Sequence, residues 1–166
     1  MKNVNARASA ESFILNGLSI RQAMPASVFH DLLGTPDRII AAGSPAPDGH
    51  RNNHIHIYDH LGIYINEHHY TYLLSSVTFV LSPEFSSFQP TNPFSGTLEI
   101  GSLSITSPFP ESEIVHSELN FQCRLSGTWT LEGNPTNWIN LDSKRKIVHS
   151  ASVGLPHDPH DDTCRP

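Results

Sequence analysis

One short pattern occurs twice in this sequence. Leu18-Ser19-Ile20 precedes Met24-Pro25-Ala26-Ser27, and 85 residues later Leu103-Ser104-Ile105 precedes Phe109-Pro110-Glu111-Ser112. The spacing within the two copies is identical as far as the serine. Internal repetition constrains architecture more than any other feature of a sequence. It predicts two small units of the same kind, joined in one body.

Each copy continues with signals for a short helix. In the first copy Pro25 suits the first helical position, because its fixed φ fits a helix and its missing N–H needs no partner there. Apolar residues recur with helical spacing over Val28–Leu33, and Gly34 and Pro36 are typical of a helix end. In the second copy we expect a helix over Pro110–Leu119.

Strand signals follow each predicted helix. His54–Tyr58 and Ile63–Asn66 alternate between apolar and polar residues around a turn at Asp59–Gly62, which predicts a β-hairpin. Further strands are expected at residues 13–20, 37–42, 72–81, 97–105, 121–125, 128–132, 138–141 and 145–150.

These patterns predict an α+β protein of two tandem repeats, each a short helix packed on an antiparallel β-sheet. The expected organisation is a flexible N-terminus at 1–12, a first repeat at 13–88, a connection at 89–96, a second repeat at 97–152 and a disordered tail at 153–166.

The charge balance bears on the class of partner. The formal net charge is −6, and the ten basic residues are scattered apart from the run Lys144-Arg145-Lys146. Nucleic-acid binding needs clustered Lys and Arg, so nucleic acid is not expected as a partner. An acidic surface suits either simple solubility or a basic protein partner.

Targeting signals are not visible. The two cysteines, Cys123 and Cys164, cannot form a disulfide framework, which indicates a reducing compartment. The polar residues 1–11 do not resemble a signal peptide, and no apolar run is long enough to span a membrane. We therefore expect a cytoplasmic protein, of bacterial type, that does not bind membranes.

The first repeat resembles a known unit. An isoleucine strand, the opening Met24-Pro25-Ala26-Ser27 and the ending Leu32-Leu33-Gly34-Thr35-Pro36 are similar to the repeat shared by β-lactamase inhibitor proteins and the SmpA/BamE-type outer-membrane assembly lipoproteins. The second copy lacks that ending. The resemblance implies a scaffold that binds other proteins, with two sheets joined side by side around an open concave face. It carries over no functional residue.

A histidine- and tyrosine-rich segment is the most distinctive polar feature. His54, His56 and Tyr58 share one side of the predicted strand, because side chains alternate with period two. Tyr64 is expected to face them across the hairpin, while Ile55, Ile57, Ile63 and Ile65 pack on the opposite side. This places the polar and aromatic side chains on the open face of the sheet.

Three interpretations of this segment remain open. It is a solvated strand face, a protein-binding face rich in tyrosine, or a metal site built on His54 and His56. The order His54-x-His56-x-x-Asp59-His60 has one residue too many for the pattern of metallo-β-lactamase-type hydrolases. The candidate partner-binding residues are His54, His56, Tyr58, Asp59, His60, Tyr64, Glu67, His68 and Tyr70.

No common catalytic motif appears, whether Gly-x-Ser-x-Gly, a Walker-type loop or His-Glu-x-x-His. We expect no enzymatic activity and no cofactor. The leading hypothesis is a cytoplasmic protein-binding inhibitor, an immunity protein that covers the active site of a bacterial toxin. The alternative is a small metal-dependent enzyme that uses His54 and His56. The sequence does not predict the oligomeric state.

Overall fold

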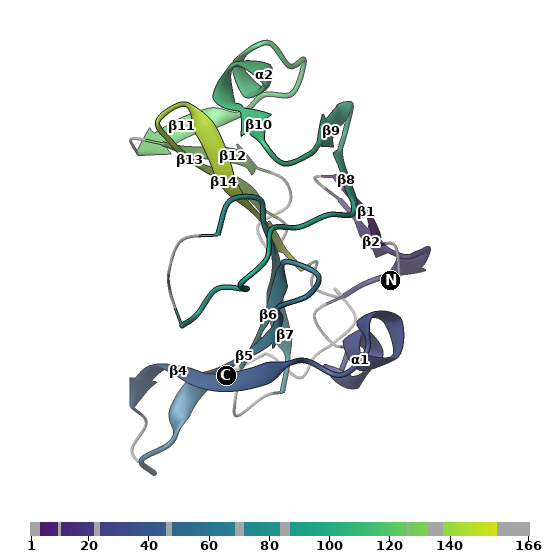
Figure 1. Cartoon of the computed structure of the whole chain (residues 1–166), viewed down its shortest axis with the longest axis vertical. Helices are drawn as coiled ribbons and strands as arrows, with labels where there is room; N and C mark the ends of the chain where they lie inside the picture. Colours follow the sequence, from purple (N-terminus) through teal and green to yellow (C-terminus); the bar gives the residue numbers. More distant parts are fainter. Residues whose placement is uncertain are drawn as a thin grey trace.

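In the part of the chain that it describes, the computed structural model has two packed β-sheets and two short helices (Figure 1). It describes residues 4–9, 11–21, 24–45, 48–68, 72–83, 87–125, 127–132 and 138–155. Most of these residues lie in strands, and the smaller sheet combines strands that are far apart in the sequence, β1 to β3 with β8 and β9.

The smaller sheet has five strands in the order β3-β2-β1-β8-β9. Both copies of the repeated sequence begin here, in the hairpins β2–β3 and β8–β9, and β1 lies between the hairpins. β1 pairs antiparallel with β2 and parallel with β8. The strands are β1 (Asn5–Ala8), β2 (Phe13–Leu15), β3 (Leu18–Ser19), β8 (Thr97–Ile100) and β9 (Leu103–Ile105).

The larger sheet joins two antiparallel meanders through β7 and β14, in the order β11-β12-β13-β14-β7-β6-β5-β4. The short strand β10 (Phe109–Pro110) also pairs with β14. The other strands are β4 (Arg38–Pro45), β5 (Arg51–Tyr58), β6 (Ile63–His68), β7 (Leu74–Val80), β11 (Gln122–Leu125), β12 (Thr128–Glu132), β13 (Trp138–Lys144) and β14 (Ile147–Gly154).

The core lies between the two sheets. The small sheet runs along one face of the large one (Figure 1), and a single buried cluster contains residues of both sheets and both helices. Helix α1 (Ser27–Leu33) contributes Phe29 and Leu33, whereas helix α2 (Glu111–Val115) contributes Ile114. Burial of these side chains, rather than the helices' own hydrogen bonds, holds such short helices in place.

The predicted architecture is wrong. The protein is mostly β. Two sheets pack on each other, whereas we expected two tandem α+β repeats, each with a short helix packed on its own sheet. The second helix spans five residues instead of the expected Pro110–Leu119. Residues 13–20 and 97–105, which were expected to belong to separate repeats, form two hairpins that share one sheet through β1. The prediction of antiparallel sheets is confirmed.

The ends of the described chain differ from expectation as well. Residues 1–12 were expected to be a flexible start, but β1 lies in the middle of the small sheet with Ala6 and Ala8 buried. At the other end β14 continues to Gly154, and Leu155 is fully buried. The rest of the tail, 156–166, lies outside the described residues. Neither helix in the described ranges is long and apolar enough to cross a membrane.

Candidate functional site

The histidine and tyrosine side of the β5–β6 hairpin faces the core, not an open surface. Tyr58 pairs with Ile63 and His56 with Ile65, so these four side chains share one face of the sheet. The turn at 59–62 therefore pairs even-numbered residues of β5 with odd-numbered residues of β6, opposite to the predicted arrangement. Tyr58 is fully buried and His56 is 5% exposed. The expected open face is thus a covered one.

Helix α1 lies over part of this face. The rings of His30 in α1 and His56 in β5 are tilted against each other with centroids 5.7 Å apart. His56 Nε2 is 2.9 Å from Glu67 Oε2, and His54 Nδ1 is 3.9 Å from the same oxygen. We call His30, His54, His56, Tyr58 and Glu67 the histidine cluster.

Three polar atoms in the histidine cluster are buried and have no hydrogen-bond partner among the residues that the structure describes. They are Nε2 of His30, Nδ1 of His56 and the hydroxyl oxygen of Tyr58. Burial raises the pKa of Tyr58, because the phenolate is the form that loses hydration. Within the described ranges, no three His, Cys, Asp or Glu side chains are arranged to hold a metal ion. The geometry therefore adds no support to the metal-dependent alternative.

The other predicted site residues are dispersed around this end of the sheet. Asp59 accepts hydrogen bonds from Nε and Nη2 of Arg38, at 2.8 and 3.0 Å, and from the backbone N–H of Thr91. The Arg38 guanidinium lowers the pKa of Asp59. His60 Nδ1 lies 2.9 Å from Asp37 Oδ2, and this contact lowers the pKa of Asp37.

Tyr64 lies on the opposite face of the sheet from Tyr58, half-buried and paired with Ile57. His68 ends β6 and is also half-buried, and Tyr70 lies outside the described residues. The described candidates thus occupy two faces and a turn, so they do not form one surface.

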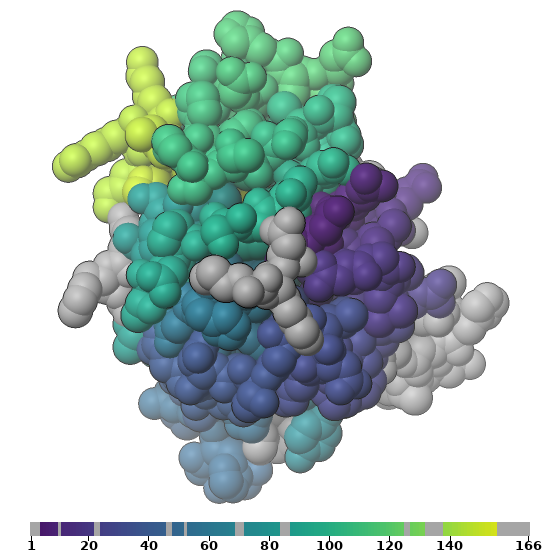
Figure 2. Space-filling view, turned by 45° about the vertical axis from the view of Figure 1, so that its right-hand side comes forward, coloured from purple at the N-terminus to yellow at the C-terminus, as the bar shows by residue number. Residues whose placement is uncertain are grey.

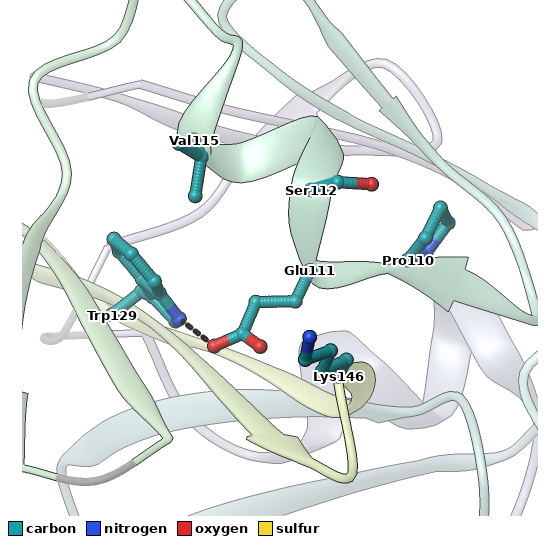
Figure 3. Close-up of a pocket in the computed structure, with 6 residues that line it drawn as sticks. All are labelled: Pro110, Glu111, Ser112, Val115, Trp129 and Lys146. Atoms are coloured by element: carbon teal, nitrogen blue, oxygen red, sulfur yellow. Dashed lines mark hydrogen bonds between the residues drawn. The ribbon is translucent and has the colours of Figure 1, made fainter.

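A pocket at the other end of the large sheet is the better candidate. It has a volume of about 490 Å³ and opens between α2, the strand β12 and the turn that joins β13 to β14 (Figure 3). We call it the Trp129 pocket. Its lining residues are Pro110, Glu111, Ser112, Val115, Trp129 and Lys146.

Hydrogen bonds fix the polar wall of the Trp129 pocket. Glu111 Oε1 accepts a hydrogen bond from Trp129 Nε1 at 2.8 Å and another from Ser143 Oγ at 3.0 Å. The indole therefore cannot rotate without losing a charge-assisted bond. Figure 3 shows the ammonium of Lys146 on the side of the Glu111 carboxylate away from the indole.

The apolar wall is exposed. Val115 is 59% exposed at the end of α2, where its side chain points toward Trp129 (Figure 3). An exposed apolar side chain that shares a pocket with an indole is typical of binding surfaces.

Backbone pairing joins α2 to the β13–β14 hairpin. Pro110 pairs with Ile147, and the N–H of Glu111 donates to the carbonyl of Lys146 at 2.9 Å. Pro110 is extended, so the helix starts directly after this short strand. The first turn of α2 and the hairpin tip therefore hold each other in position.

The sequence contains the parts of this pocket but no signal that joins them. Lys144–Lys146 is the basic run noted above, and Glu111 stands in the second copy of the repeated pattern. Trp129 is 18 residues further along the chain than Glu111. The contact between them depends on the pairing of β10 with β14, which no local periodicity indicates.

A family model described as "Domain of unknown function (DUF7738)" matches residues 7–115. The chain belongs to this DUF7738 family. The matched segment contains Glu111 and Val115 of the Trp129 pocket, whereas Trp129 and Lys146 follow it. No curated protein and no solved structure matches the chain.

Proposed function

We propose that this protein is a protein-binding module that contacts its partner through the Trp129 pocket. The observation that carries the proposal is the exposed Val115, which lines the same pocket as an indole held by Glu111. Large side chains in a fixed orientation lose little entropy on binding, and tryptophan is enriched among the residues that dominate interface energies.

The surface is distinct from the one that the sequence favoured. His56 is buried against His30 of α1 and Tyr58 is fully buried, so a partner could reach these side chains only after a rearrangement of the protein. The side chains around the Trp129 pocket need no such rearrangement. The proposal therefore transfers the binding role from the β5–β6 hairpin to the α2 end.

A narrower form of the proposal is an immunity-type inhibitor in a bacterial cytoplasm. Its support is the sequence resemblance to inhibitor scaffolds and the net charge of −6, which suits a basic toxin. The test is to express the product of the neighbouring gene with and without this chain. Restored growth is expected, and a harmless neighbouring product would contradict the narrower form.

The broader proposal is tested with displayed random peptides. The wild-type chain should enrich a peptide family that Val115→Asp no longer binds, because the new carboxylate would be desolvated in the apolar wall. The matched control is Ile39→Asp, at a 54% exposed isoleucine in β4 at the opposite end of the sheet. The same peptides should bind this control. Equal binding by all three proteins, or no enrichment by the wild type, would overturn the proposal.

A further inference from the structure

The tip of the β13–β14 hairpin combines charge with an unusual backbone. Lys144, Arg145 and Lys146 are exposed, and they supply three of the ten basic residues of an acidic chain. Arg145 has φ 54° and Lys146 has φ 64°. Lys144 pairs with Ile147, so these two residues form a two-residue hairpin loop.

Two-residue loops with positive φ at both positions favour Asn-Gly or Asp-Gly. Arg and Lys are poor choices for this backbone, because their Cβ atoms are crowded in the left-handed region. Sparsely populated backbone conformations are a reason to look for a function when they are observed. Here the two residues that strain the turn are the same two that place positive charge at its tip.

This charge borders the Trp129 pocket. Lys146 lines the pocket itself, and the hairpin projects from the body of the molecule beside α2, as the yellow segment in Figure 2 shows. On the helix side the rim carries the Glu111 carboxylate, which is engaged by Trp129 and Ser143. The rim is thus basic on the hairpin side and acidic on the helix side.

We infer that the Trp129 pocket takes an acidic segment of a partner protein, which rests on the proposed function of this surface. A large apolar side chain of the segment enters between Val115 and Trp129. Carboxylates next to that side chain pair with Arg145 and Lys146. The acidic rim of α2 disfavours the reversed placement, so the segment binds in one direction.

The probes are three synthetic peptides. The first has a tryptophan between pairs of aspartates, the second replaces the aspartates with asparagines, and the third replaces the tryptophan with serine. Fluorescence anisotropy of labelled peptides gives their affinities. We expect the first to bind about tenfold more tightly than the second, with the difference shrinking as salt rises. The third should show the weakest binding.

The decisive variant is Arg145→Asn combined with Lys146→Gly. It removes both charges and installs the loop residues that this backbone prefers, so the protein should become more stable while its affinity for the acidic peptide falls about tenfold. Arg51→Glu is the control, because it changes the net charge by the same amount at an exposed position on β5. Its affinity should stay near that of the wild type.

The outcomes separate this inference from the broader proposal. Equal affinity for the aspartate and asparagine peptides would overturn the inferred preference for an acidic segment. If both peptides nevertheless bind at the pocket, the broader proposal of a protein-binding site would stand. Loss of affinity in Arg51→Glu as large as in the hairpin variant would also overturn it, because net charge alone would then explain the binding. Failure of every peptide, including those selected by display, would overturn both.

Discussion

Each end of the large sheet carries an aromatic side chain at a matching place, but the two side chains differ in burial. The register forms one continuous row, Tyr58–Ile63–Phe79–Ala151–Leu141–Trp129, across six strands. At one end of this row Tyr58 is fully buried. At the other end Trp129 is half-buried and lines an open pocket.

The two helices also differ in length and in burial. Each follows a hairpin of the small sheet, and the 85-residue spacing places Val115 at the position of His30 and Ile114 at that of Phe29. Helix α1 has seven residues and buries Phe29 and Leu33. Helix α2 has five, buries Ile114 and ends with an exposed Val115.

Polar groups are also treated differently at the two ends. The hydroxyl of Tyr58 is buried without a partner, whereas the N–H of Trp129 donates to Glu111. The α1 end therefore buries apolar side chains but leaves a buried hydroxyl without a hydrogen bond. At the α2 end the polar groups are hydrogen-bonded, and an apolar side chain is exposed. One end suits stability and the other suits binding.

Shortening a buried apolar residue of α1 and an exposed one of α2 should give the largest contrast in stability. Phe29→Ala should lower the free energy of unfolding by about 3–5 kcal/mol, because it leaves a cavity in the core. Val115→Ala should change it by less than about 0.5 kcal/mol, since the side chain is exposed. Urea denaturation followed by circular dichroism measures both. Similar losses would mean that α2 is as tightly packed as α1.

Replacing each of the two aromatic residues by phenylalanine should change the free energy of unfolding in opposite directions. Trp129→Phe should cost about 1–2 kcal/mol, because Glu111 loses a hydrogen-bond donor and the pocket loses contacts. Tyr58→Phe should be neutral or stabilising by up to about 1 kcal/mol, because it removes an unpartnered buried hydroxyl. The same denaturation series compares them. A costly Tyr58→Phe would show that the hydroxyl has a partner.

The sequence predicted strand positions better than it predicted how they associate. The β5–β6 hairpin lies where alternation indicated, and the first helix lies within the Pro25–Gly34 signals. Alternation assigns residues to faces within one strand. It does not show which face of the next strand lies on the same side of the sheet. Tyr58 pairs with Ile63, so the polar side of β5 shares a face with the isoleucine side of β6, opposite to the prediction.

The remaining errors come from contacts between distant segments. Ala6 and Ala8 give a weak strand signal, and β1 is a strand because β2 and β8 lie on either side of it. The partner of Ala8 in β8 is Ile100, far along the chain. The Trp129 pocket has the same origin, since β10 brings Glu111 to β14 and so within reach of Trp129.

Alkaline pH should destabilise the protein through Tyr58. Burial raises the pKa of Tyr58 in the folded state, so the unfolded chain loses the phenol proton at a lower pH than the folded protein does. The free energy of unfolding is therefore unaffected by this group below the ordinary tyrosine pKa near 10, and it falls as pH rises from there through the folded pKa. One pH unit above the ordinary value the loss should be about 1.4 kcal/mol. Tyr58→Phe should lack this component, and Tyr64→Phe is the matched control. An identical alkaline profile for Tyr58→Phe would contradict the burial of this hydroxyl.

The hairpin variant should show a small gain in stability. Arg145→Asn with Lys146→Gly should raise the free energy of unfolding by about 1 kcal/mol, since both residues then suit positive φ. Thermal denaturation monitored by circular dichroism measures it. A lower stability would indicate that the two basic side chains contribute packing that offsets the strain.

The central claim is that the α2 end, rather than the α1 end, meets a partner. Two-dimensional ¹H–¹⁵N NMR of the labelled protein tests it directly, because the chain contains two tryptophans, whose indole N–H signals can be assigned with Trp129→Phe. On titration with the acidic tryptophan peptide, the Trp129 indole signal should shift together with the amides of α2 and residues 144–147, while the Trp138 indole and the amides of α1 stay in place. Shifts confined to α1 and the β5–β6 hairpin, with the Trp129 indole unchanged, would contradict the claim.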